Sequence, residues 1–241
     1  MEVQASRQSV VWDALRDVLA ARAAQTGRDR LDVIDAGGGT GGFAVPLAVL
    51  GHSVTVVDPN ADSLAAAQRR AAERDVRISA VQGEADGLDS VVGEQAADLI
   101  ICHSVLEYVD SPADALAAIA RVLRPGGTVS VLAAGVVAAV LHRALTGRFD
   151  EARALLERDR QGMPGEGPRW FTLPGLTALI EGAGLTPGAA LGAEIFGGLV
   201  PSVLVDAEPG AADSLRALEA AAATYPALRD VAAKLHVLGR R

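Results

Sequence analysis

A run of glycines early in the chain places the strongest constraint on how the chain folds. Every residue from 37 to 42 except Thr40 is glycine. The strand-like segment at residues 31–35 precedes this run, and apolar side chains recur at helical spacing over residues 45–50 after it. Glycine adopts positive φ without a steric penalty and lets another group approach the backbone closely. The pattern therefore predicts a strand, a tight turn, and a helix whose first N–H groups face a ligand.

Strand-like and helical segments continue to alternate beyond this unit. Further apolar runs of strand length occur at residues 54–58, 76–81, 99–102 and 128–132, and helical periodicity occurs at residues 62–74 and 112–123. Alternation at this spacing is typical of βαβ units, in which helices cover both faces of a parallel sheet. We therefore expect an α/β fold with a doubly wound, mostly parallel sheet.

The composition narrows the class of protein. Cys102 is the only cysteine, which excludes a disulfide framework and a cysteine-based zinc site and favours a reducing compartment; we expect no metal. The first residues lack the apolar core of a secretory signal, and the longest apolar run, residues 129–141, is shorter than the ~18 residues that span a membrane. A net charge of -8 argues against a surface built broadly for nucleic acid. We expect a cytoplasmic protein with no membrane partner.

Two classes of nucleotide cofactor fit the glycine run. Gly37, Gly39 and Gly42 satisfy the G-x-G-x-x-G pattern of dinucleotide-binding proteins. Asp35 with Gly37, Gly39 and Gly41 satisfies the D-x-G-x-G-x-G pattern of methyltransferases. A dinucleotide brings a pyrophosphate, which a neighbouring carboxylate repels, whereas S-adenosylmethionine brings a sulfonium and an ammonium, which a carboxylate attracts. Asp35 therefore favours S-adenosylmethionine.

Two acidic positions further along the chain are predicted to complete the cofactor site. Asp58 ends the second expected strand, where a carboxylate can accept hydrogen bonds from the hydroxyls of a cofactor ribose. Asp86 follows the third expected strand, in position to accept a hydrogen bond from the adenine amino group, and the backbone near Ala85 could donate to a ring nitrogen. The structural alternatives are a helix cap at Asp58 and an exposed acidic loop at Ala85 and Asp86.

These motifs together resemble those of class I S-adenosylmethionine-dependent methyltransferases. The resemblance is carried by residues 35–41, Asp58, residues 98–109, and the Leu-Arg-Pro-Gly-Gly turn at residues 123–127. It implies a Rossmann-like methyltransferase fold with a seven-stranded sheet, and S-adenosyl-L-methionine as the cofactor.

We expect one methyltransferase domain over residues 1–241. Residues 1–135 would form the cofactor-binding core, and residues 136–172 a helical insertion that covers a substrate as a lid. Residues 173–241 would supply the C-terminal helices and closing strands.

A narrower resemblance is to the tRNA carboxymethoxyuridine methyltransferases, which esterify the carboxylate of a modified wobble uridine. It rests on residues 98–109, 142–150 and 235–237. The resemblance implies that the cofactor is contacted by an arginine ahead of the first helix, a glycine pair, the ribose acid, the adenine loop and a histidine. In this chain those positions are Arg7, Gly37 and Gly38, Asp58, Ala85 and Asp86, and His103.

The methyl acceptor stays open between a modified tRNA nucleotide and a small metabolite. The family has a Tyr-Asn pair and a Lys-rich stretch where this chain has residues 134–135 and 165–169, and tRNA binding depends on cations and aromatic stacking. A carboxylate acceptor is already ionised and needs only a cation such as Arg143 or Arg148 to orient it. A hydroxyl or amine acceptor favours a base, for which His103 and His142 are the candidates. His103, at the end of the fourth expected strand, is the predicted catalytic residue.

Two further functions compete with methyl transfer. The glycine pattern alone also fits an NAD(P)-dependent oxidoreductase. A non-catalytic S-adenosylmethionine-binding module, with an insertion that contacts a protein partner, is the other alternative.

Overall fold

The glycine run lies between a strand and a helix, as the sequence predicts. The computed structural model describes residues 9–161 and 167–241, so Arg7 lies outside the described residues. The first helix in the described part is α2, Ser9–Thr26. After it, the glycine run joins strand β1, Asp32–Ala36, to helix α3, Ala44–Val49.

Strands and helices then alternate through the first half of the chain. The elements are β2 (Ser53–Asp58), α4 (Ala61–Ala72), β3 (Ser79–Gln82), α5 (Leu88–Val92), β4 (Ala97–His103), α6 (Pro112–Val122) and β5 (Leu123–Ala134). The predicted strands and helices of this half are confirmed, with boundaries shifted by a few residues. Helix α5 was not predicted, because a segment this short shows no helical period.

The second half is mainly helical. Its elements are α7 (Val136–Leu145), α8 (Phe149–Gln161), α9 (Leu173–Gly182), β6 (Thr186–Ala193), α10 (Ser202–Ala207), α11 (Ala211–Ala222), α12 (Pro226–Arg229) and β7 (Lys234–Arg240). The helical character of the insertion is confirmed. Strand β6 was not predicted, because its Pro187 and its two glycines are residues that usually argue against a strand.

The seven strands form one sheet in the order β3-β2-β1-β4-β5-β7-β6. Strand β1 pairs in parallel with β2 and β4, and β2 pairs in parallel with β3. These pairings confirm the doubly wound α/β fold. The strand order reverses between β1 and β4, and open α/β sheets bind ligands at the carboxyl ends of the strands at such a point. The glycine run follows β1 and His103 ends β4, so both lie at this edge.

The Pro-Gly-Gly segment belongs to β5 rather than to a turn ahead of it. The Gly126 N–H donates to the Arg241 carbonyl at 3.0 Å, and the Arg241 N–H donates to the Gly127 carbonyl at 3.0 Å. Two consecutive residues therefore oppose one, which is a β-bulge between antiparallel strands. Gly126 has a φ of 76°, the positive value that the first position of a glycine bulge requires. The predicted turn at residues 124–127 is wrong, and the sheet is mixed.

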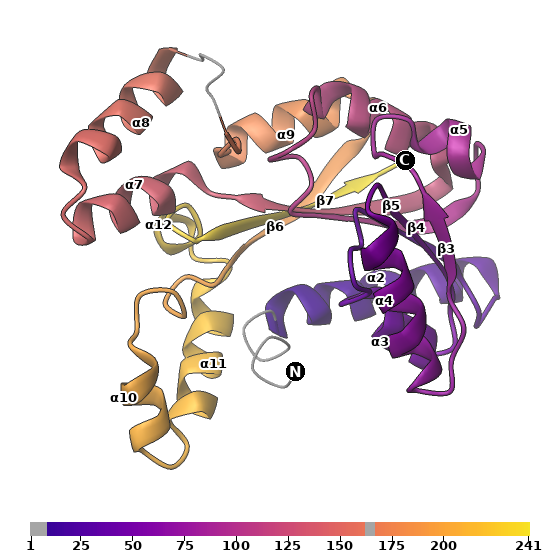
Figure 1. The fold of residues 1–241 in the computed structure, drawn as a ribbon, viewed down its shortest axis with the longest axis horizontal. Coiled ribbons are helices and arrows are strands. Elements are labelled where there is room, and N and C mark those ends of the chain that lie inside the picture. The colour runs from indigo at the N-terminus through magenta and orange to yellow at the C-terminus, as the bar shows by residue number, and fades with distance from the viewer. Residues whose placement is uncertain (1–8, 162–166) are drawn as a thin grey trace. The chain divides into compact units, whose positions relative to one another are not determined.

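The chain divides into two compact units. One comprises Arg16–Val131, Thr177–Gly188 and Leu238–Arg241, and it holds the glycine run and all of β1 to β4. Within it, the first six residues of β4 are buried, as expected for a strand covered on both faces. Figure 1 shows α3 and α4 on one side of these strands and α5 and α6 on the other.

The other unit comprises Met1–Leu15, Leu132–Leu176 and Ala189–Val237. In it, α7 and α8 form a helical hairpin (Figure 1). The single domain and its predicted subdivision stay predictions, as does the cytoplasmic location. No helix in the described ranges has the length and apolar character needed to cross a membrane.

Candidate functional site

The glycine run is tightly packed where it leaves β1. Gly37 has a φ of 71°, and its N–H donates to the Val57 carbonyl at 2.7 Å. A Cβ atom at Gly37 would lie 2.3 Å from Cγ2 of Val105, and one at Gly38 would lie 2.5 Å from Cγ of Asp35. Both positions therefore need glycine for steric reasons, and the loop exposes backbone rather than side chain.

Asp58 connects the glycine run to the end of β2. Its Oδ2 atom accepts a hydrogen bond from the Gly39 N–H at 2.9 Å, and its Oδ1 atom accepts one from the Asn60 N–H at 2.9 Å. Asn60, not Asp58, caps helix α4 by accepting from the Asp62 N–H at 2.8 Å. The helix-cap alternative for Asp58 is therefore wrong. Each carboxylate oxygen can accept a second hydrogen bond, which leaves capacity for ribose hydroxyls.

Asp35 occupies a more buried place than the sequence pattern suggests. The residue is only 3% exposed. Burial raises the pKa of its carboxyl to about 7; the Ala44 N–H lowers this pKa, and the negative charge of Asp58 raises it. Asp35 is therefore not a fixed negative charge at neutral pH, as the sequence interpretation assumed, and its ionisation depends on what binds beside it.

His103 is held at the carboxyl end of β4 by two other elements. Its Nε2 atom lies 2.8 Å from Oγ of Ser130 on β5. The ring of Phe43 packs against it edge to face, with 4.6 Å between ring centroids and 85° between ring planes. Because Phe43 directly precedes α3, this contact joins His103 to the end of the glycine run.

The loop after β3 reaches the same edge of the sheet. The Gly83 N–H donates to the backbone carbonyl of Asp58 at 3.3 Å. Ala85 is buried and Asp86 is half-buried, so this loop is not the fully exposed acidic loop of the structural alternative. The structure thus brings together the predicted residues of four strand ends. As contacts to a cofactor, they stay predictions.

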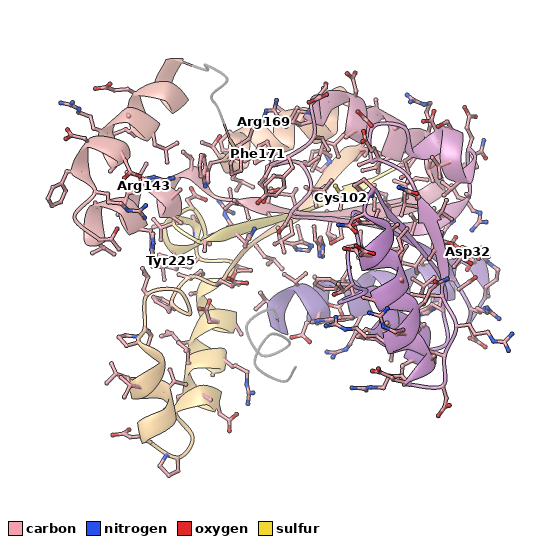
Figure 2. The ribbon with its side chains drawn as sticks, in the orientation of Figure 1. Asp32, Cys102, Arg143, Arg169, Phe171 and Tyr225 are labelled. Carbon is pink, nitrogen blue, oxygen red and sulfur yellow. The ribbon has the colours of Figure 1, made fainter. Side chains whose placement is uncertain are left out.

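Three residues around the site carried little or no signal in the sequence. Phe43 resembles any apolar residue at the start of a helix, and Ser130 is marked only as a polar residue within an apolar run. Cys102 is buried in β4 (Figure 2), and burial raises the pKa of its thiol to about 12, with further contributions from the charges of Glu107 and Asp35. Cys102 is therefore not a nucleophile at neutral pH. No group of His, Cys, Asp and Glu residues suited to a metal occurs in the part of the chain that the structure describes.

The arginines predicted to orient an acceptor lie in the other unit. The guanidinium of Arg143, labelled in Figure 2, stacks over the Trp170 ring at 4.8 Å from the centroid. Its Nε atom lies 3.7 Å from Oε2 of Glu151, and an amino group of Arg148 lies 3.5 Å from the same oxygen. Both cations therefore face a carboxylate of their own unit.

Comparison with known families decides between the two glycine patterns. Residues 34–131 match the family described as "Methyltransferase domain". Over these residues, which make up less than half of the chain, the sequence is similar to methyltransferases. The matched residues span the ends of β1, β2, β3 and β4, where the predicted site residues from Asp35 to His103 lie.

Known proteins are similar to this chain in sequence or in fold. The chain is 33% identical over 161 residues to the tRNA 5-carboxymethoxyuridine methyltransferase of Escherichia coli K12, a match over 64% of this chain and 58% of that protein. It is 31% identical over 98 residues to a ubiquinone biosynthesis O-methyltransferase of Rickettsia conorii, over 41% of this chain and 33% of that protein. The chain thus matches less than two thirds of the length of either relative.

A solved structure shares the fold over most of the chain. An S-adenosylmethionine-dependent methyltransferase from Mesorhizobium loti superposes with a TM-score of 0.60 at 19% identity, and the match covers 95% of this chain and 97% of that one. At this identity the likeness shows the fold, and it agrees with the strand order described above.

Proposed function

We propose that this chain is an S-adenosylmethionine-dependent methyltransferase that transfers the methyl group to an oxygen of a small acceptor, either a carboxylate or a hydroxyl. The observation that carries the proposal is the joining of the glycine run to Asp58 at the point where the strand order reverses. This arrangement occurs within the residues that match the methyltransferase family.

The described residues fit this cofactor on three counts. The backbone at Gly37 and Gly38 is bare because a Cβ atom there would clash. Asp58 has lone pairs for ribose hydroxyls beside the loop. The Oδ2 atom of Asp35 is buried and has no hydrogen-bond partner in the described part of the chain. In its charged form it suits a cation and would repel a pyrophosphate.

The chemistry asks little of the protein beyond alignment. When bound, the cofactor supplies a methyl group on a positively charged sulfur, which is a good leaving group. The glycine run and Asp58 would hold the adenosine end of the cofactor, and the protein would align the acceptor oxygen with the methyl carbon and exclude water. A carboxylate acceptor attacks as it is, whereas a hydroxyl acceptor needs a base, for which His103 at the end of β4 is the candidate.

Charge pairing in the insertion favours a small acceptor over tRNA. Lys234 is the only lysine in the sequence. Arg143 and Arg148 lie beside Glu151, and Arg153 lies 3.4 Å from Asp150. A cation that is paired with a carboxylate attracts a phosphate backbone less strongly. The affinity for tRNA depends on such attraction.

A modified tRNA nucleotide is the second candidate. Its support is the 33% identity to the tRNA 5-carboxymethoxyuridine methyltransferase of Escherichia coli K12. That relative also suggests a carboxylate as the accepting group, and the ubiquinone O-methyltransferase suggests a hydroxyl.

Transfer of a labelled methyl group tests the proposal. Methyl-labelled S-adenosylmethionine is incubated with the protein and either a small-molecule cell extract or total tRNA, with Asp58→Ala as the control. Label in the small-molecule fraction supports the proposal, and volatile label released by mild base identifies a methyl ester rather than an ether. Label in tRNA alone supports the second candidate. Label in neither fraction, with the cofactor bound, contradicts methyl transfer.

A further inference from the structure

Asp35 is a buried carboxyl group with an unused oxygen beside the glycine run. The residue is 3% exposed, and its Oδ2 atom has no hydrogen-bond partner among the residues that the structure describes. The same atom would lie 2.7 Å from a Cβ atom at Gly38, so the carboxyl packs directly under the bare backbone of the loop. An unpartnered oxygen in such a place costs free energy unless a ligand or a proton compensates it.

Among the described residues, the ionisable groups around Asp35 include acids and no compensating cation. On β1's two neighbours, its register partners are the apolar Val56 of β2 and Ile101 of β4. Asp58 at the end of β2 raises the pKa of Asp35 through its like charge.

The remaining ionisable groups on this side come from β4 and the loop after it. The negative charges of Glu107 and Asp35 both raise the pKa of the Cys102 thiol. His103 follows Cys102, and its Nε2 atom is directed to Ser130. From the start of α3, the Ala44 N–H is the group that favours the charged form of Asp35. Asp35 therefore stands among two further carboxyl groups and a neutral thiol.

We infer that Asp35 is a proton-linked cation site, which gives up its proton when a positively charged centre of the cofactor binds beside it. The inference rests on the proposed function, because the cation is that of S-adenosylmethionine. The step is an exchange: the carboxyl O–H bond breaks, the proton leaves to solvent, and the carboxylate faces the cation. No other bond changes.

Two cationic centres of the cofactor share this chemistry. The α-ammonium is present in both S-adenosylmethionine and S-adenosylhomocysteine, whereas the sulfonium is present only in the former. If the sulfonium is the partner, Asp35 discriminates the cofactor from the product after methyl transfer, when the charge at sulfur is lost. If the ammonium is the partner, proton release accompanies both ligands equally.

Titration calorimetry in buffers of different ionisation enthalpy measures the exchange without any turnover. With a free-protein pKa of about 7, binding of S-adenosylmethionine at pH 7 should release about half a proton, and binding at pH 8.5 almost none. Below pH 7 the affinity should fall by up to about tenfold per pH unit. Release with S-adenosylmethionine alone identifies the sulfonium, and equal release with S-adenosylhomocysteine identifies the ammonium.

Two variants make the assignment specific to this residue. Asp35→Asn, which keeps the shape of the neutral acid, should bind without proton release and lose the affinity change below pH 7. Glu73→Gln, at an exposed acid on α4's C-terminus, should release protons like the wild type. Binding without proton release in the wild type, or unchanged release in Asp35→Asn, overturns this inference alone. Absence of S-adenosylmethionine binding overturns the proposed function as well.

Discussion

The Nε2 atom of His103 and the hydroxyl of Ser130 lie 2.8 Å apart across strands β4 and β5. Ser130 is fully buried, whereas His103 is half-buried at the edge where the strand order reverses. A buried hydroxyl bonded to one ring nitrogen restricts the orientation of the imidazole. Ser130 on β5 thus positions His103, the side chain that is predicted to act in the site.

Removal of the Ser130 hydroxyl should therefore loosen His103. We expect Ser130→Ala to lower the free energy of unfolding by about 1 kcal/mol. We expect it to weaken S-adenosylhomocysteine binding by up to about fivefold, because the histidine loses its fixed orientation. Urea unfolding and calorimetry check both values. Ser90→Ala, which removes a hydroxyl bonded to the Gly87 carbonyl on exposed α5, should leave binding unchanged. Wild-type affinity in Ser130→Ala would contradict the predicted role of His103.

Substitution of Gly37 should disrupt the site by two separate effects. The residue has a φ of 71°, and a new Cβ atom would meet Val105 at 2.3 Å. We expect Gly37→Ala to destabilise the protein by about 1–3 kcal/mol and to abolish measurable cofactor binding.

Two further variants separate these effects. Gly182→Ala, outside the glycine run and with open space at its Cβ position, should behave like the wild type. Adding Val105→Ala to Gly37→Ala should recover only the part lost to the clash, since the backbone strain remains. Thermal unfolding and calorimetry report the outcome, and full recovery in the double variant would show that strain at φ contributes nothing.

The positions of the strand ends and the contact between His103 and Ser130 differ in how well the sequence predicts them. The strand ends at Asp58 and His103 were predictable, because apolar runs of fixed length end there and parallel strands bring their carboxyl ends to one edge. The pairing of His103 with Ser130 was not, because it depends on the register of two neighbouring strands. The protonation of Asp35 was missed for a similar reason: it depends on burial by segments distant in the sequence, which a local pattern does not reveal.

The carboxylate of Asp98 should stabilise the folded protein most strongly at neutral pH. It is 1% exposed and accepts hydrogen bonds from the Asp32 N–H at 3.1 Å and from the guanidinium groups of Arg22, Arg28 and Arg124. Burial alone would raise the pKa of this carboxyl, but these donors outweigh it and hold the pKa below its ordinary value.

Asp98→Asn should therefore destabilise the protein by about 3 kcal/mol at pH 7, because it leaves arginines without their buried partner. A carboxyl with a lowered folded-state pKa stabilises above its unfolded pKa, so the difference from wild type should shrink as the pH falls below about 4. Urea unfolding across pH 3–7 measures it. Asp89→Asn, at the more exposed pair with Arg121, should cost less than about 1 kcal/mol. Equal costs for the two variants would contradict the role given to burial.

The contribution of Asp35 to stability should change with pH in the opposite direction to that of Asp98. Its folded-state pKa of about 7 lies above the unfolded value, so the unfolded chain loses this proton first and stability declines as the pH rises from about 4 to 7. Asp35→Asn should therefore be more stable than the wild type at pH 8, by about 2–4 kcal/mol, and similar to it at pH 4. Parallel thermal unfolding at both pH values checks this gain. A variant less stable than wild type at pH 8 would show that Asp35 is charged and compensated within the protein.

Binding of S-adenosylhomocysteine and of NADH to the purified protein, measured by calorimetry, tests the central claim most directly. The joined glycine run and Asp58 predict saturable binding of S-adenosylhomocysteine at one site per chain, lost in Asp58→Ala, and no binding of NADH. Binding of NADH without binding of S-adenosylhomocysteine would contradict the proposed methyltransferase function and favour an oxidoreductase.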